Sequence, residues 1–268
     1  MFLTGGRLFS PRRFRAEFKS KRSLTPKERE RRLKPLNDLF SMAECSLVAD
    51  TVDYFVSNSI PFDPPSVVAD VLSSIGQTHV SGDFHKVVAG NPEMYFEPVP
   101  RMAEVLKKMK DAGKTLLLIS NSPFWYVDAG MRHILGEKWR SMFDCVVASA
   151  GKPGFYVEKT RPFREVVLGE RGEDGRAAET MSFEKIDSLD PDKVYSGGCL
   201  RELVRLTPAL KAKKDPKSDD LNLNLLNTNV LYLGDSLFAD LVDAKREYGW
   251  LTAAILRELK DEVSGSEP

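Results

Sequence analysis

The sequence predicts an α/β fold in which a doubly wound, three-layer parallel sheet of the Rossmann-like type is joined to a helical cap. Three observations support this fold class. From about residue 98 onward, short apolar runs alternate with helical patterns, and the links between them are short. Polar residues directly follow several of the apolar runs, as at the strand ends of open α/β sheets. The stretch before residue 98 contains helical patterns only.

The composition is that of a folded protein without a membrane span. Apolar residues make up 42% of the 268 residues, which is enough for one large domain or for a core with a cap. No apolar run approaches the roughly 20 residues that a membrane-spanning helix needs. The three cysteines and three histidines form no paired motif, so neither a disulfide framework nor a zinc site is expected. This cysteine usage fits a reducing compartment, and we expect a cytoplasmic protein.

The zero net charge conceals a basic N-terminal arm. Residues 1–36 contain 12 Lys and Arg against 3 Asp and Glu, so this segment carries +9 and the remainder −9. A basic arm can bind nucleic acid or a membrane surface, and its Arg- and Ser-rich start also resembles a mitochondrial transit peptide. Gly5, Gly6, Pro11 and Pro26 interrupt any amphipathic helix there. We therefore expect residues 1–34 to be a poorly ordered arm that does not bind nucleic acid, with a mitochondrial location as the alternative.

Residues 35–97 predict the helical cap. Apolar residues across 38–56 suffice for a mostly buried helix, and prolines 61, 64 and 65 end it. A second helix is expected over 66–75 and a short third helix over 83–88.

The α/β core is predicted over 98–260. Its first part contains a helix from Pro100 to Gly113, a strand over 114–119, a second helix ending at Gly136 and a strand over 143–148. Ser122 is the expected N-cap of the second helix, with Pro123 at its first position.

The second part of the core contains two expected polar insertions, over 165–198 and 208–228, of which 211–220 is a charge run typical of a mobile loop. A helix over 195–206 is predicted between them. The apolar run 230–233 predicts a buried parallel strand, followed by a helix that Ser236 caps and Gly249 ends. A last strand over 251–256 and a tail over 261–268 complete the chain.

Ser120, Lys152 and Asp235 each follow a predicted strand. Because the carboxyl ends of parallel strands share one edge of the sheet, we expect a hydroxyl, an ammonium group and a carboxylate near one pocket. A helix N-terminus after Ser120-Asn121-Ser122 favours a phosphate, Lys152 adds positive charge, and Asp235 suits Mg²⁺. Taken singly, Ser120 and Asp235 are as well explained by turns, and Lys152 and the helical Asp240 by solvent exposure. Together they predict a phosphoryl-transfer site.

Several segments resemble the cytosolic purine 5′-nucleotidase family, and specifically its 5′-nucleotidase domain-containing branch, within the haloacid dehalogenase superfamily. They are residues 117–131 (LLISNSPFWYVDAGM), 149–156 (SAGKPGFY), 197–203 (GGCLREL) and 231–240 (LYLGDSLFAD), with 35–40 and 47–55 in the cap region. The resemblance implies that Ser120, Asn121 and Lys152 bind phosphate and that Ser120 and Lys152 take part in catalysis. It also implies that Asp235 ligates Mg²⁺, with Asp240 in support.

The implied activity is that of a Mg²⁺-dependent phosphatase acting on a phosphomonoester such as a nucleoside 5′-monophosphate, and a homo-oligomer is possible. One departure is important. The superfamily's first motif, Asp-x-Asp-x-Thr, supplies the attacking carboxylate, and it is absent from these 268 residues. We therefore expect the chain to start downstream of that motif and to be inactive as given. The alternative is a non-catalytic member that binds phosphate or another protein.

The same departure predicts a defect in the sheet. In the family, the strand that carries the first motif lies between the strands ending at Ser120 and Asp235. Without it, these two strands should face an empty slot with unpaired backbone groups.

Overall fold

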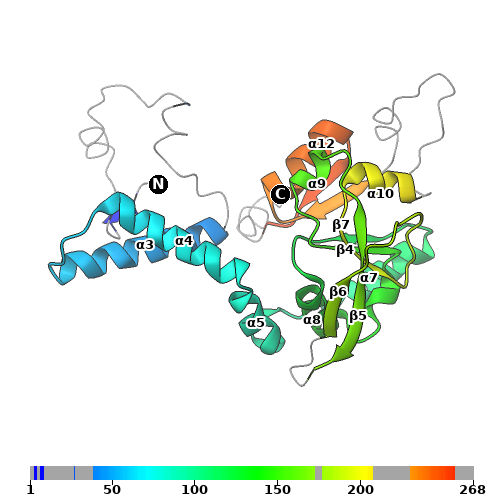
Figure 1. The fold of residues 1–268 in the computed structure, drawn as a ribbon, viewed down its shortest axis with the longest axis horizontal. Helices are drawn as coiled ribbons and strands as arrows, with labels where there is room; N and C mark the ends of the chain where they lie inside the picture. The colour runs from blue at the N-terminus through cyan, green and yellow to red at the C-terminus, as the bar shows by residue number, and fades with distance from the viewer. Residues whose placement is uncertain are drawn as a thin grey trace, which may run out of the picture. The chain divides into compact units, whose positions relative to one another are not determined.

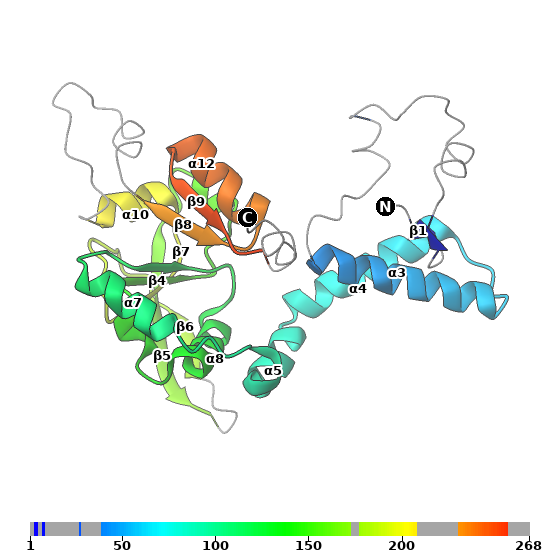
Figure 2. The ribbon, with the colours of Figure 1, turned by 180° about the vertical axis from the view of Figure 1, so that it is seen from behind.

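The computed structural model describes residues 39–172, 177–207 and 230–256, with 3–4, 7–8 and 27 before them (Figures 1 and 2). The chain divides into two compact units, one of residues 1–84 and 257–268 and one of residues 85–256. Most of the basic arm, the charge run 211–220 and the tail 261–268 lie outside the described residues.

In the first unit, two long helices form an antiparallel pair, α3 (Leu39–Ser57) and α4 (Pro64–Val80). The Asp63 carboxylate caps α4 by accepting a hydrogen bond from the Ser66 N–H at 3.0 Å. Two short strands, β1 (Leu3–Thr4) and β2 (Arg7–Leu8), pair antiparallel. Both long helices were expected, but neither contains a buried side chain. The prediction of a mostly buried first helix is wrong, because no residue of α3 is buried.

The second unit contains the other helices that the structure describes. They are α5 (Asp83–Gly90), which begins at the boundary, α6 (Pro92–Tyr95), α7 (Met102–Asp111), α8 (Phe124–Leu135), the 3₁₀-helix η1 (Trp139–Met142), α9 (Gly154–Val157), α10 (Leu200–Leu206), the π-helical turn η3 (Leu237–Val242) and α12 (Asp243–Tyr248).

A five-stranded sheet forms the centre of this unit, with the strand order β3-β4-β7-β5-β6. Its strands are β3 (Leu117–Ile119), β4 (Cys145–Ala148), β7 (Val194–Gly197), β5 (Phe163–Arg171) and β6 (Ala177–Met181). β3, β4 and β7 are parallel, whereas β5 runs antiparallel to β7 and to β6. The expected parallel α/β sheet is confirmed, with an antiparallel hairpin added at one side.

A separate two-stranded parallel sheet contains β8 (Leu231–Gly234) and β9 (Leu251–Ala254). β3 is the edge strand of the larger sheet, and no described strand pairs with the free edge of β3 or of β8. These are the two strands that were expected to face an empty slot.

Helices cover both faces of the five-stranded sheet, which gives the expected three layers. Alternate residues of β4 enter different cores: Cys145 and Val147 pack with α9, α10 and α12, whereas Val146 and Ala148 pack with α8 and η1. This alternation follows from the period of two in a strand. No described helix is long and apolar enough to cross a membrane.

Three sequence predictions need correction. The helix expected over 195–206 begins only at Leu200, because 194–197 form β7, a buried strand at the end of the segment expected as a polar insertion. The N-cap of α8 is Pro123 rather than Ser122. β8 is parallel as predicted but not buried, since Leu231 and Leu233 are 53% and 51% exposed on one face of the strand.

Candidate functional site

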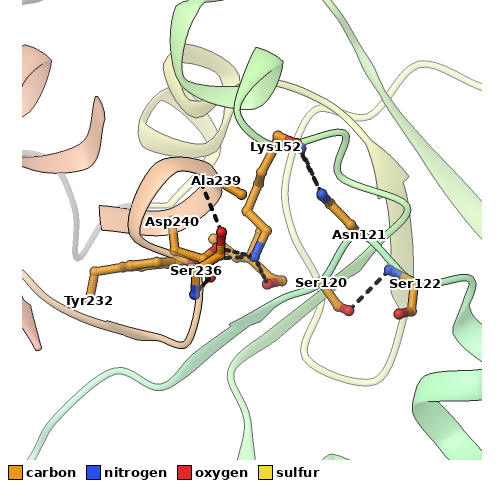
Figure 3. Close-up of polar contacts among 9 residues, drawn as sticks. Ser120, Asn121, Ser122, Lys152, Tyr232, Ser236, Ala239 and Asp240 are labelled. Atoms are coloured by element: carbon orange, nitrogen blue, oxygen red, sulfur yellow. Dashed lines mark hydrogen bonds and ion pairs between the residues drawn. The ribbon is translucent and has the colours of Figure 1, made fainter. Parts of the chain in front are cut away.

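Lys152 lies at the centre of the candidate site (Figure 3). Its Nζ donates hydrogen bonds to the Ile119 carbonyl at 3.1 Å and to the Tyr232 hydroxyl at 3.0 Å. The same atom forms an ion pair with Asp240 Oδ1 at 2.6 Å, and the two side chains are 10% and 5% exposed. One ammonium group therefore connects the end of β3 with β8 and with η3.

The turn that carries Lys152 is held against the end of β3. The Ala150 N–H donates to the Ser120 carbonyl and the Ser149 N–H donates to the Ser122 carbonyl, both at 2.9 Å. Ser149 and Gly151 have left-handed backbone conformations, with φ of 47° and 75°. Residues in this region turn the chain sharply, which brings Lys152 back across the edge of the sheet.

Ser120 and Asn121 lie beside Lys152, but their side chains are engaged locally. The Ser120 hydroxyl accepts a hydrogen bond from the Ser122 N–H at 3.1 Å. The Asn121 side chain pairs with the backbone of Lys152 through two hydrogen bonds. Ser120 can still donate its hydroxyl hydrogen to a phosphate, whereas both functional ends of the Asn121 amide already have partners.

The two predicted metal ligands have different surroundings. Asp240 is buried, and its Oδ2 accepts a hydrogen bond from the Ser236 N–H at 3.2 Å, while its Oδ1 faces Lys152. Gly234 allows this approach, because a Cβ there would lie 2.6 Å from Asp240 atoms. Asp235 is exposed, and its side chain has no partner among the described residues. The structure thus joins Asn121, Lys152 and Asp240 directly, and the convergence of Asp235 with them stays a prediction.

Tyr232 is a member of the site that sequence reasoning missed. Its hydroxyl accepts from Lys152 and donates to Asp240 Oδ1 at 3.1 Å. Burial, reinforced by the neighbouring Tyr156 and Asp240, raises the pKa of Tyr232 far above its ordinary value. The group therefore stays a neutral hydroxyl that can bridge the two charges. Tyr232 lies three residues before Asp235 in an apolar strand. This position only weakly indicates a site residue, because a tyrosine in such a strand usually packs in the core.

The start of α8, where a phosphate was expected, has a carboxylate beside it. Glu179 of β6 accepts a hydrogen bond from the backbone of Trp125, and burial is the main cause that raises the pKa of Glu179. A carboxylate that accepts at a helix N-terminus takes one of the free donors that an anion would otherwise use. The positive charge available to a phosphate here therefore comes mainly from Lys152.

The donor chemistry of the site suits Mg²⁺ only in part. No group of three His, Cys, Asp or Glu side chains gathers within the described ranges. Both oxygens of Asp240 have partners, so Asp235 is the carboxylate available to a cation. Mg²⁺ binds through one or two carboxylates and takes its other ligands from water and substrate phosphate. Asp235 can serve in this way, with Asp240 in support through Lys152 and the Ser236 backbone.

One surface hollow of about 270 Å³ is lined by Lys138, Arg140, Ser141, Pro191 and Asp192. It contains none of the predicted site residues.

Known proteins match almost the whole chain. The model of the 5′ nucleotidase family matches residues 2–267. The chain is 35% identical over 231 residues to 5′-nucleotidase domain-containing protein 2 from Homo sapiens, a match that covers 86% of this chain and 40% of that protein. It is 28% identical over 245 residues to 5′-nucleotidase domain-containing protein 1 from Bos taurus, covering 86% of this chain and 48% of that protein. The chain thus spans less than half the length of these relatives.

Proposed function

Because the chain belongs to the 5′-nucleotidase family, we propose that it is the phosphate-binding part of a Mg²⁺-dependent phosphatase and that it has no turnover by itself. The substrate class is a phosphomonoester, with nucleoside 5′-monophosphates as the first candidates. The arrangement around Lys152 supports this proposal most directly. A buried ammonium group at a sheet edge, with the Ser120 hydroxyl at the end of the same edge strand, suits a phosphate, and the exposed Asp235 carboxylate at the end of β8 would hold its counter-ion.

In this proposal each residue has one task. Lys152 neutralises phosphate oxygens, for which it must exchange its contact with Asp240 for one with the substrate. Ser120 donates its hydroxyl hydrogen to another phosphate oxygen. Asp235 holds Mg²⁺, which supplies further charge neutralisation when it is bound. Before substrate binds, Asp240 and Tyr232 hold the Lys152 ammonium group at the sheet edge.

The lack of turnover follows from the missing nucleophile. The 268 residues contain no Asp-x-Asp-x-Thr, and among the described residues the Ser120 hydroxyl contacts the Ser122 N–H rather than a base. Loss of a nucleophile alone costs on the order of a millionfold in well-studied hydrolases. The remaining groups supply binding and charge stabilisation, but no atom that can attack phosphorus in line.

The test uses the purified chain with Mg²⁺, a panel of nucleoside monophosphates and a generic aryl phosphate. We expect no steady release of phosphate above the uncatalysed rate. Steady release that Lys152→Ala abolishes would overturn the proposal, because another carboxylate would then have taken over the attack.

The alternative is a non-catalytic member that binds phosphate or another protein, and the Lys152–Asp240 ion pair favours it, since Asp240 already compensates the charge of Lys152 without a substrate. Calorimetry with inorganic phosphate tests the shared binding step. Supply of a separate polypeptide with an Asp-x-Asp-x-Thr strand then distinguishes the two, because only the first proposal expects turnover to appear.

A further inference from the structure

The Asn121 side chain contacts the backbone of Lys152 at two points (Figure 3). Its Oδ1 accepts from the Lys152 N–H at 2.7 Å, and its Nδ2 donates to the Lys152 carbonyl at 3.0 Å. This is the paired geometry of a sheet ladder, supplied by a side chain 31 positions away. An amide engaged in this way has both of its functional ends occupied by one residue.

These two bonds fix the Lys152 backbone within a turn that has further contacts on either side. Backbone bonds from Ser149 and Ala150 attach the first half of the turn to residues 120–122. The Arg161 guanidinium donates to the Ala150 carbonyl at 3.1 Å, and the Phe155 N–H donates to the Gly151 carbonyl at 3.1 Å. The N–H and carbonyl of Lys152 itself are both bonded to Asn121, which ties the Lys152 backbone to a residue just after the end of β3.

The other end of Lys152 is fixed independently. Its ammonium group binds the Ile119 carbonyl, the Tyr232 hydroxyl and Asp240, which lie on β3, β8 and η3. A long, flexible side chain reaches one point reproducibly only if its origin is also fixed. A shift of about 1 Å in a functional group can cost about a hundredfold in function.

We propose that Asn121 is a positioning residue for Lys152 and not a phosphate ligand. This rests on the proposed function in one respect only, namely that Lys152 meets the phosphate. The proposal replaces the role that Asn121 was expected to have from its position beside Ser120.

A double-mutant cycle separates the two roles, with inorganic phosphate as the probe and calorimetry as the measurement. Asn121→Ala should weaken phosphate binding by about fivefold when Lys152 is present, the effect of about one hydrogen bond's net free energy. In a Lys152→Met background the same change should alter the affinity by less than about twofold, because the residue it positions has gone. An equal loss in both backgrounds would overturn the proposal and make Asn121 a direct ligand.

A second measurement does not depend on phosphate binding. The rate at which an acylating reagent modifies each lysine is followed by peptide mass spectrometry. In Asn121→Ala, Lys152 should be modified about fivefold faster relative to Lys110 and Lys193, which have ion pairs elsewhere. The control is Asn58→Ala, since the Asn58 amide also binds a backbone carbonyl, that of Tyr54 at 2.8 Å. It should leave the Lys152 rate unchanged.

The two measurements separate failure of the proposed function from failure of this inference. If the unmodified chain binds no phosphate, the proposed function fails, and the lysine modification still decides the role of Asn121. An unchanged Lys152 rate in Asn121→Ala would overturn the positioning role whatever the chain binds.

Discussion

Lys152 and Asp240 are the two residues on which the site depends. Both are almost fully buried, and their 2.6 Å contact is supplemented by the Tyr232 hydroxyl and the Ser236 N–H. Burying two charges is costly, and the cost is recovered only where the remaining hydrogen-bonding capacity is also satisfied. The role of this pair is therefore better explained by its positioning of the Lys152 ammonium group than by a contribution to stability.

Removal of one partner from this pair should destabilise the fold strongly. Asp240→Asn leaves the Lys152 ammonium group buried without a counter-ion, and we expect a loss of about 3 kcal/mol in the free energy of unfolding. Urea denaturation measures this change. The control is Lys193→Met, which breaks an ion pair with Glu165 whose side chains are 46% and 20% exposed, and which should change the free energy of unfolding far less. Equal effects of the two substitutions would contradict the burial argument.

Cys145 should make the fold sensitive to alkaline pH. Burial, with a smaller contribution from Asp144, raises the pKa of the Cys145 thiol to about 12 from an ordinary value of 9.0. Between these values the folded thiol keeps a proton that the unfolded thiol loses. Stability should therefore be complete below about pH 9 and should fall by up to about 1.4 kcal/mol per pH unit above it.

Unfolding in urea at pH 8 and pH 10 measures this loss, and Cys145→Ala is the matched variant. The variant lacks the thiol, so the drop in its free energy of unfolding between the two pH values should be smaller. The buried Tyr156 and Tyr232, whose pKa values are also raised, add a loss of the same sign in both proteins. An identical drop in the two proteins would exclude a contribution from Cys145.

At the scale of elements, β3 and β8 each have an edge that pairs with no described strand. Leu116 and Ser120 direct their backbone groups toward β4, so by alternation the backbones of Leu117 and Ile119 face away from it. In β8, the Val230 and Gly234 carbonyls accept from β9, which leaves the N–H groups of Leu231 and Leu233 on the open side. The Ile119 carbonyl has a substitute partner in Lys152.

Hydrogen exchange should reveal this alternation directly. The amides of Leu117, Ile119, Leu231 and Leu233 should exchange much faster than that of Leu118, which faces the buried strand β4. Nuclear magnetic resonance of the exchanging protein measures each rate. Uniform protection along β3 would show that another segment pairs with its edge.

For the whole molecule, the distribution of charge matters more than its sum. Residues 1–36 carry +9 and the remainder −9. The helical pair of the first unit, α3 and α4, contains acidic residues but no Lys or Arg, and it exposes Leu39, Leu47 and Tyr54 at 54%, 49% and 62%. A chain with zero net charge and two regions of opposite charge has little long-range electrostatic repulsion between its copies.

We therefore expect reversible self-association that weakens with salt. Light scattering near pH 7 should report larger particles at low ionic strength than at 0.5 M salt, where the Debye length falls below about 5 Å. A variant without residues 2–36 has a net charge near −9 and should remain monomeric under both conditions. Association that grows with salt would instead implicate the exposed apolar side chains.

The sequence by itself determined the local features of this protein. Apolar runs bounded by glycine, serine and proline located β3, β4, β8 and β9, and Ser236 and Gly249 were identified as the caps at either end of the segment formed by η3 and α12. These features depend on residues within a few positions of one another, whose steric and hydrogen-bonding preferences are the same in any fold. The placement of Lys152 beside the end of β3 also followed, because the ends of parallel strands share one edge.

The tertiary structure decided which groups actually meet. Lys152 and Asp240 are 88 positions apart in the sequence, yet they form an ion pair. The Asn121 side chain, which was expected to bind phosphate, is bonded to the Lys152 backbone. β7 is a buried central strand although its neighbourhood in the sequence is polar, because β4 and β5 supply its hydrogen bonds from both sides. Such contacts arise from packing between distant segments, and the residue pattern of one segment does not indicate which other segments it will contact.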